Sequence, residues 1–477
     1  MIIKNGRIID PANQIDCIGD IYVKDGIITN VIIKDDVSEL SDISKDKISS
    51  ADCNSDKEGS IDEEIIDATG LVVMPGFIDV HSHFRDPGFE YKEDIYTGAK
   101  AAAAGGYTTV VLMCNTKPTV DNPETLDYVL NKGRETDIKV ESCSSVTYGL
   151  KGEKLTDFDE MIKHGAVGFT DDGIPLMDEN ILREAFKKAK DYPISLHEED
   201  KTFIKNNGIN HGKASEHYGV YGSPREAEIS LIKRDLQIAL EEGGMIDVQH
   251  ISSKEGVELV RNALKNDFKK QGVPEEKLNK LIHKCNAANI NDCTDGIASG
   301  LIRHIHAEAT PQHFSLTEDA LIEKGTLGKL NPPFREEADR LAIIEGLKDG
   351  TIDLIATDHA PHAAEEKAKS ITEAPSGMIG LETAFALAVT HLVNEAGMSL
   401  SDVVSKITVN PAMLYKFDRG TLGVGKSADI TIADVNEKWV VTKDDIKSKS
   451  CNTPFLGEEL TGRIKYTICD GKTVYRN

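Results

Sequence analysis

The feature that most constrains the fold is a regular alternation of short apolar runs with amphipathic or Ala-rich stretches over residues 75–418. The apolar runs are rich in β-branched residues, which is typical of buried strands. Strands that alternate with helices in this way form parallel sheets or barrels. The alternation predicts eight strands, the number that closes a TIM-like (β/α)₈ barrel, at residues 77–80, 108–113, 138–144, 166–170, 194–196, 245–249, 303–309 and 352–357.

Both ends of the chain have a different pattern, in which β-branched runs are separated by turn dipeptides. Asn-Gly at 5–6 and Asp-Gly at 25–26 and 470–471 indicate hairpins. We therefore predict one small β-sandwich domain, built from residues 1–74 and 419–477, and a catalytic (β/α)₈ barrel between them over residues 75–418.

Two segments do not fit this α/β scheme. Residues 36–64 are rich in Asp, Glu, Ser and Lys and have little periodicity, so we interpret them as an exposed acidic excursion. Residues 265–299 are rich in Lys, Asn and Asp, with Leu278 and Ile282 at helical spacing. We interpret this second segment as a helical insertion in the barrel.

Charge and cysteine usage limit the function classes. The formal net charge is −25 over 477 residues. Such a surface repels phosphate backbones and anionic lipid, so we expect neither nucleic-acid nor membrane binding. The eight cysteines lack the dense spacing of a secreted disulfide framework, and no signal-peptide pattern opens the chain. These features favour a cytoplasmic protein that acts on a small molecule.

Polar residues follow the predicted strands at the points where these strands end. In a barrel, the carboxyl ends of all strands meet at one rim, which is where active sites of this fold lie. Residues far apart in the sequence are therefore expected to share one site. The candidates are His81 and His83 after the first strand, Asn115 after the second, Asp172 after the fourth, His197 after the fifth, His250 after the sixth and Asp358 after the eighth.

The residue types at this rim suit a metal centre. His81 and His83 are two residues apart, so on a strand both side chains point to the same face. Imidazole and carboxylate together suit zinc or a similar divalent ion. Four histidines and two aspartates are too many for one tetrahedral ion, and two metals bridged by a carboxylate and a hydroxide would use them all.

Four motifs give the chain a resemblance to a known family. They are residues 81–88 (HSHFRDPG), 115–118 (NTKP), 169–173 (FTDDG) and 357–362 (TDHAPH). Together they resemble the bacterial class I dihydroorotases of the amidohydrolase superfamily, and the similarity extends over nearly the whole chain. The resemblance implies reversible cyclisation of N-carbamoyl-L-aspartate to L-dihydroorotate and water, in de novo pyrimidine (UMP) biosynthesis.

The resemblance also implies roles for individual residues. Many related enzymes have a carboxylated lysine on the fourth strand, whereas this chain has none there and the family pattern places a bridging aspartate at Asp172. Asp358 would ligate a metal and act as general acid and base. The implied cofactor is Zn²⁺, two ions per subunit, held by His81, His83, Asp172, His197, His250 and Asp358.

The family pattern assigns a second group of residues to the substrate. Arg85, Asn115 and His362 would bind its free carboxylate, with Arg85 and the His362 imidazole adding positive charge beside the metals. We interpret Arg335 as a surface residue, and His304 and His306 as packing residues near the rim. The implied substrate contacts are His83, Arg85, Asn115, Asn331, His362, Ser376 and Gly377.

Two alternatives remain open. One is another cyclic-amide hydrolase, such as an allantoinase or a dihydropyrimidinase. The other is a non-catalytic barrel that serves as a scaffold for aspartate carbamoyltransferase. All six implied ligands are present, which favours the enzyme. We expect a homodimer, and association with aspartate carbamoyltransferase is a further hypothesis.

Overall fold

The structure is a computed structural model that describes residues 1–36, 64–284 and 301–477. The predicted acidic excursion at 36–64 therefore lies almost entirely outside the described residues, as does the end of the predicted insertion at 265–299. The described part of that insertion contains the end of α7 (Lys254–Lys270) and α8 (Glu275–Lys284), in which Leu278 and Ile282 are buried. No described helix has both the length and the apolar content needed to cross a membrane.

Parallel strands form the central barrel. They are β6 (Phe77–Ser82), β7 (Tyr107–Leu112), β8 (Lys139–Ser142), β9 (Phe169–Thr170), β10 (Ile194–Leu196), β11 (Ile246–Val248), β12 (Ile305–Ala309) and β13 (Leu354–Ile355). Single parallel bridges join Ser144 to Phe169 and Ser82 to His359, and these bridges link the β6–β8 sheet to the β9–β13 sheet on both sides. All eight strands overlap the predicted ranges. The predicted (β/α)₈ fold is confirmed.

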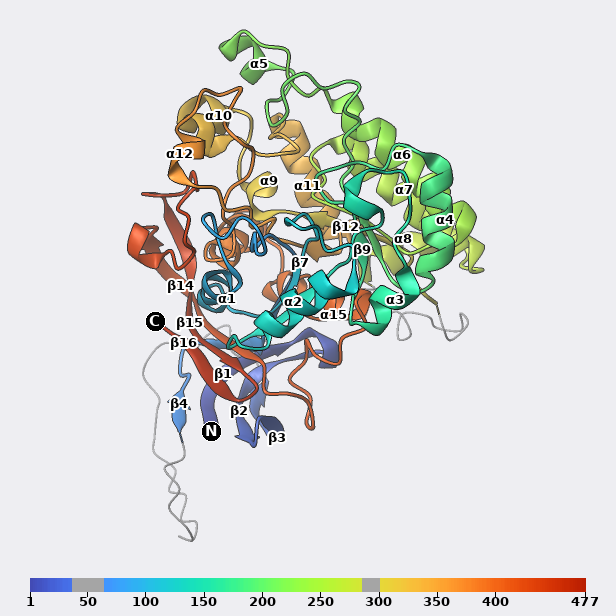
Figure 1. Ribbon diagram of the computed structural model, residues 1–477. Coiled ribbons are helices and arrows are strands. Elements are labelled where there is room, and N and C mark those ends of the chain that lie inside the picture. The colour runs from blue at the N-terminus through green and yellow to red at the C-terminus, as the bar shows by residue number, and fades with distance from the viewer. Residues whose placement is uncertain (37–63, 285–300) are drawn as a thin grey trace, which may run out of the picture.

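Helices surround the barrel (Figure 1). Asp94 caps α1 by accepting a hydrogen bond from Thr97 N at 2.9 Å, as expected for a carboxylate at a helix start. Besides α7 and α8, the helices are α1 (Ile95–Ala104), α2 (Pro123–Gly133), α3 (Phe158–Lys163), α4 (Glu179–Ala189), α5 (Lys213–Tyr218), α6 (Arg225–Glu242), α9 (Pro311–Ser315), α10 (Asp319–Lys324), α11 (Glu337–Asp349), α12 (Ala364–Lys367), α13 (Ala384–Leu387), α14 (Leu400–Ser405) and α15 (Val409–Leu414).

Both termini contribute to one mixed sheet below the barrel (Figure 1). Strand β5 pairs with β1 on one side and with β14 on the other, so it joins the two chain ends. Apolar residues from both ends pack into a shared core on this sheet, which fits the predicted small β domain. The strands are β1 (Ile2–Asp10), β2 (Ile15–Lys24), β3 (Ile27–Asp36), β4 (Ile65–Asp67), β5 (Val72–Pro75), β14 (Ile430–Val440), β15 (Glu459–Cys469) and β16 (Lys472–Arg476).

Two of the three turns predicted in this sheet are confirmed. The Asp-Gly pairs at 25–26 and 470–471 connect β2 to β3 and β15 to β16, and all four residues have positive φ. The hairpin predicted at Asn5-Gly6 is wrong, because these residues lie inside β1 at an irregularity in its pairing with β2. A Cβ at Gly6 would lie 2.5 Å from Val73 Cγ2, so the glycine allows close packing there.

Candidate metal centre

The closed barrel brings the six predicted metal ligands together. His81 lies in β6 with His83 just beyond it, and the other four follow β9, β10, β11 and β13. All six side chains are buried. The barrel therefore places these six side chains close together at the carboxyl ends of its strands, as the sequence predicts.

One group of potential ligand atoms comes from β6 and the segment after β13. His81, His83 and Asp358 each offer an atom within 4.8 Å of the others. Asp358 Oδ1 lies 3.1 Å from His83 Nε2 and 3.6 Å from His81 Nε2. Two imidazole nitrogens and a carboxylate oxygen at these distances are a typical donor set for a divalent ion.

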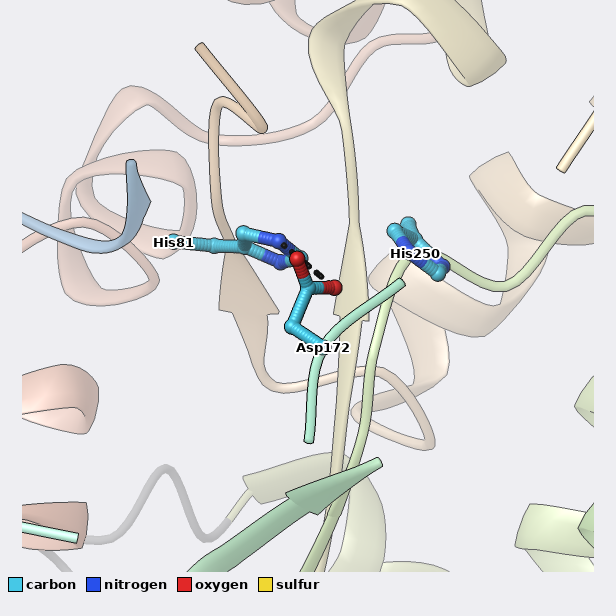
Figure 2. Close-up of side chains that lie close together, drawn as sticks. All are labelled: His81, Asp172 and His250. Atoms are coloured by element: carbon cyan, nitrogen blue, oxygen red, sulfur yellow. Dashed lines mark ion pairs between the residues drawn. The ribbon is translucent and has the colours of Figure 1, made fainter. Parts of the chain in front are cut away.

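A second group shares His81 and adds Asp172 and His250 (Figure 2). Asp172 is central, because Oδ1 lies 3.4 Å from His81 Nε2 and Oδ2 lies 3.4 Å from His83 Nε2. On the other side, Asp172 Oδ1 lies 3.9 Å from His197 Nδ1, and that nitrogen is 3.0 Å from His250 Nε2. A carboxylate between two sets of histidines is suited to bridging two ions.

The donor atoms fit a cation. The buried His81 Nε2 has no hydrogen-bond partner among the described residues, although an unsatisfied buried polar atom is costly. Burial, together with the neighbouring His197 and His81, lowers the pKa of His250 well below its usual value, which leaves the neutral imidazole that metals bind. Burial alone would raise the pKa of Asp172, but His81 and His83 hold it well below its usual range.

Backbone conformation supports a functional interpretation of the rim. Arg85, His250 and Asp358 have φ values of 61°, 34° and 44°, a region that residues other than glycine rarely adopt. Such conformations cost of order 1–3 kcal/mol each and cluster at functional sites, where the surrounding structure holds them.

Carboxylates outside the cluster orient two of its histidines. Glu308, at the end of β12, lies 2.9 Å from His81 Nδ1, so the other ring nitrogen of His81 faces the cluster. Glu199 lies 3.2 Å from His197 Nε2 in the same way. Sequence reasoning missed both residues, although Glu308 follows the strand-end rule that found the ligands.

Replacing Glu308 with Gln is expected to weaken metal binding about 10–100-fold, because partners of this kind orient the ligand imidazole and increase its basicity. Equilibrium dialysis against a graded zinc buffer measures the effect. The matched control is Glu184→Gln, whose side chain is 57% exposed on α4. Equal zinc affinity in the two variants would contradict an orienting role for Glu308.

The predicted substrate contacts also lie at this rim, but several of them contact other protein side chains or backbone groups. Asn115 donates to Asp172 Oδ2 at 3.0 Å, and its Oδ1 lies 3.0 Å from His83 Nδ1. The amide therefore orients two potential ligands. Asn331 Nδ2 lies 3.1 Å from His197 Nε2, and its Oδ1 accepts from Gly208 N at 3.1 Å.

Positive charge near the rim comes from Arg85, as expected, but not from His362. His362 Nε2 donates to Ser376 O at 2.8 Å, and Lys92 Nζ lies 3.4 Å from His362 Nδ1. Burial, together with Arg85, Lys92 and Lys367, lowers the pKa of His362 to about 2. His362 is therefore a neutral donor, contrary to the expectation, and the charge beside it belongs to Arg85 and Lys92.

Two further interpretations need correction. Arg335 is not a surface residue, because it is buried and donates to Asn210 Oδ1 and Ser223 O, both at 2.8 Å. His306 is a packing residue, but it lies 2.7 Å from Asp353, which precedes β13. It therefore belongs to the amino end of the barrel and not to the rim.

Comparison with known proteins agrees with this fold and gives the family. A profile of the Amidohydrolase family matches residues 72–474, so the chain belongs to the amidohydrolase family. A dihydroorotase from Clostridium acetobutylicum is 44% identical over 480 residues, covering 100% of both chains. A dihydroorotase from Lactococcus lactis is 45% identical over 478 residues, covering 100% of this chain and 99% of the other. Within the amidohydrolases, the chain groups with the dihydroorotases, which confirms the resemblance found in the motifs.

Solved structures support the fold. The L-hydantoinase from Arthrobacter aurescens has a TM-score of 0.78 and 24% identity, with coverage of 100% of this chain and 96% of the other. A D-hydantoinase structure has a TM-score of 0.76 and 21% identity, with coverage of 100% and 95%. At this level of identity the likeness concerns the barrel and its small β domain, and not the substrate.

Proposed function

We propose that this protein is a zinc-dependent dihydroorotase that interconverts N-carbamoyl-L-aspartate and L-dihydroorotate in pyrimidine biosynthesis. The observation that carries the proposal is a buried cluster of four histidines and two aspartates with the Arg85 guanidinium at the same rim. The cluster suits hydrolysis of an amide, and the guanidinium suits a ring that bears a carboxylate.

The residues of the cluster have separate tasks in this reaction. Bound divalent ions would polarise the ring carbonyl and make water more acidic. Asp358 accepts the proton of the attacking water in the hydrolytic direction and returns it to the ring nitrogen, and the reverse transfer accompanies cyclisation. His81, His83, His197 and His250 would hold the ions, with Asp172 between the two sets of histidines. Arg85 binds the free carboxylate and orients the ring.

Asp172 takes the position that a carboxylated lysine has in many related enzymes. Strand β9 contains Phe169 and Thr170 and no lysine, and the Lys163 side chain, on α3, is 70% exposed. Added bicarbonate is therefore expected to have no effect when the metal-free protein is reconstituted with zinc. The measurement is the recovery of activity with and without bicarbonate. A clear stimulation, or a modified lysine between the ions in a crystal structure, would overturn the assignment of Asp172.

A substrate panel tests the proposed activity. Dihydroorotate should be hydrolysed much faster than dihydrouracil, hydantoin or allantoin, because only dihydroorotate offers the ring carboxylate that Arg85 would pair with. Preference for a ring without a carboxylate would favour the alternative cyclic-amide hydrolases. Absence of turnover of every ring, with binding of aspartate carbamoyltransferase, would favour the scaffold hypothesis.

The proposal includes finer points about cofactor and assembly. Zinc at two ions per subunit follows from the number and kind of ligands. A homodimer, association with aspartate carbamoyltransferase, and a cytoplasmic location complete the proposal. Mass measurement in solution at a series of protein concentrations tests the dimer.

A further inference from the structure

A four-residue segment at the rim, Ala374–Gly377, is held by side chains from other parts of the chain. Each of its carbonyl oxygens accepts a hydrogen bond from such a side chain. The donors are Lys329 Nζ to Ala374 O at 2.8 Å, Lys367 Nζ to Pro375 O at 3.0 Å, His362 Nε2 to Ser376 O at 2.8 Å, Lys367 Nζ to Gly377 O at 3.0 Å and Asn452 Nδ2 to Gly377 O at 3.1 Å. The backbone of this segment is therefore fixed from several sides.

The two lysines are unusual donors because they are buried. Lys329 is 1% exposed and Lys367 is 5% exposed. Within the described ranges neither ammonium group forms an ion pair, and Glu366, beside Lys367, pairs with Lys92 at 3.0 Å instead. Burial lowers the pKa of Lys329 to about 8, and burial with the nearby Lys329 lowers that of Lys367 to about 7. Burying an amine without a carboxylate costs free energy, which the hydrogen bonds to the carbonyl oxygens partly offset.

Each lysine also lies close in sequence to a predicted substrate contact. Lys329 lies two residues before Asn331, and its own carbonyl accepts from Gly377 N at 2.9 Å. Lys367 ends α12, five residues after His362. The lysines thus tie the Asn331 segment and the His362 segment to the same backbone.

The held segment contains a buried hydroxyl without a partner. Ser376 Oγ is buried and has no hydrogen-bond partner among the described residues. A Cβ on Gly208 would lie 2.3 Å from this oxygen, so Ser376 Oγ lies against Gly208, whose amide binds Asn331. The hydroxyl is therefore on the side of the rim where a ring contact is expected.

We propose that Lys329 and Lys367 are positioning residues that fix Ala374–Gly377 so that Ser376 and Gly377 face the substrate ring. This inference rests on the proposed dihydroorotase function for its substrate. The lysines act through hydrogen bonds to carbonyls and do not touch the reacting atoms. Loss of either lysine should therefore misplace the segment without affecting the metal cluster.

The experiment compares Lys367→Met and Lys329→Met with Lys406→Met in the zinc-loaded protein. Lys406 is a matched control because it is 6% exposed and donates to a backbone carbonyl, Ile352 O, at 2.8 Å, at the amino end of the barrel. We expect kcat/KM for dihydroorotate to fall about 10–100-fold in the first two variants, mainly through KM, with normal zinc content. Lys406→Met should lower stability and leave kcat/KM nearly unchanged. Lys367→Gln and Lys329→Gln, which keep a donor, replace the Met variants if these do not fold.

A double-mutant cycle separates positioning from general stabilisation. If Lys367 acts through Ser376, the loss caused by Ser376→Ala should shrink at least about threefold in the Lys367→Met background. Independent effects, or equal behaviour of the Lys367 and Lys406 variants, would overturn the proposal.

A measurement without substrate tests the positioning role independently of the proposed function. Amide hydrogen exchange of a peptide covering residues 374–378 should be faster in both rim variants than in wild type, and unchanged in Lys406→Met. Unchanged exchange in the rim variants would refute the positioning role even if dihydroorotate is the substrate. Wild-type protein inactive on dihydroorotate would refute the proposed function, whereas faster exchange would still support the positioning role.

Discussion

Replacing Asp358 with Asn is expected to lower kcat for dihydroorotate about 10²–10⁴-fold, the range that a positioned general acid and base contributes. The substitution keeps the shape of the side chain but removes the group that takes up the proton. Asp358 also faces His83 and His81 at 3.1 and 3.6 Å, so zinc content must be measured beside the rate. Steady-state kinetics of the purified variant, saturated with zinc, give the result.

The matched control for Asp358→Asn is Asp267→Asn. Asp267 is another buried carboxylate, 2.9 Å from His304, on α7 outside the barrel. This control should keep a kcat near the wild-type value even if its stability falls. An Asp358→Asn variant with wild-type kcat would remove Asp358 from the mechanism.

Arg85→Met is expected to lower kcat/KM for dihydroorotate at least about thirtyfold while zinc content stays normal. Losing a charge-assisted pair in a partly dry site typically costs about 2–5 kcal/mol, and about 1.4 kcal/mol corresponds to a factor of ten. The Arg85 side chain is partly buried, and its Nε donates to Pro361 O at 3.3 Å, which holds it at the rim. Methionine keeps much of the length but cannot pair with a carboxylate.

The neutral ring dihydrouracil provides the internal control for Arg85→Met. Because dihydrouracil has no carboxylate, its slow hydrolysis should change little, so the variant should lose selectivity more than activity. His362→Ala should act in the same direction but more weakly, because Arg85 remains. An Arg85→Met variant with unchanged efficiency on dihydroorotate would contradict the substrate assignment.

The barrel and the positions of the metal-ligand candidates could be predicted, because closure of a barrel brings the ends of all its strands together. Strand ends share a rim whatever the sequence distance between them, so His81 and Asp358 could be placed together across 277 residues. The β-rich termini were also predictable, because Asp-Gly turns limit how the flanking strands pair. Asn5-Gly6 shows the limit of that rule, because a bulge can use the same backbone conformation as a turn.

The supporting residues could not be predicted, because their roles depend on tertiary contacts. Lys329 and Lys367 lie in segments without hydrophobic periodicity. Lysines are usually exposed, and nothing in the sequence indicates that these two are buried and donate to backbone carbonyls. Arg335 was misjudged for the same reason. The charge state of His362 depends on its burial and on three cations around it, none of which is adjacent to it in the chain.

A zinc titration of the metal-free protein, with dihydroorotate hydrolysis followed by ultraviolet absorbance, tests whether the buried cluster is a catalytic metal site. We expect no activity after chelation and recovery that saturates at up to two equivalents of zinc per chain. His83→Ala, which lacks a ligand from the cluster, should bind less zinc and recover no activity. Full hydrolysis of dihydroorotate by a preparation shown to be free of metal would contradict the assignment of the cluster as a catalytic metal site.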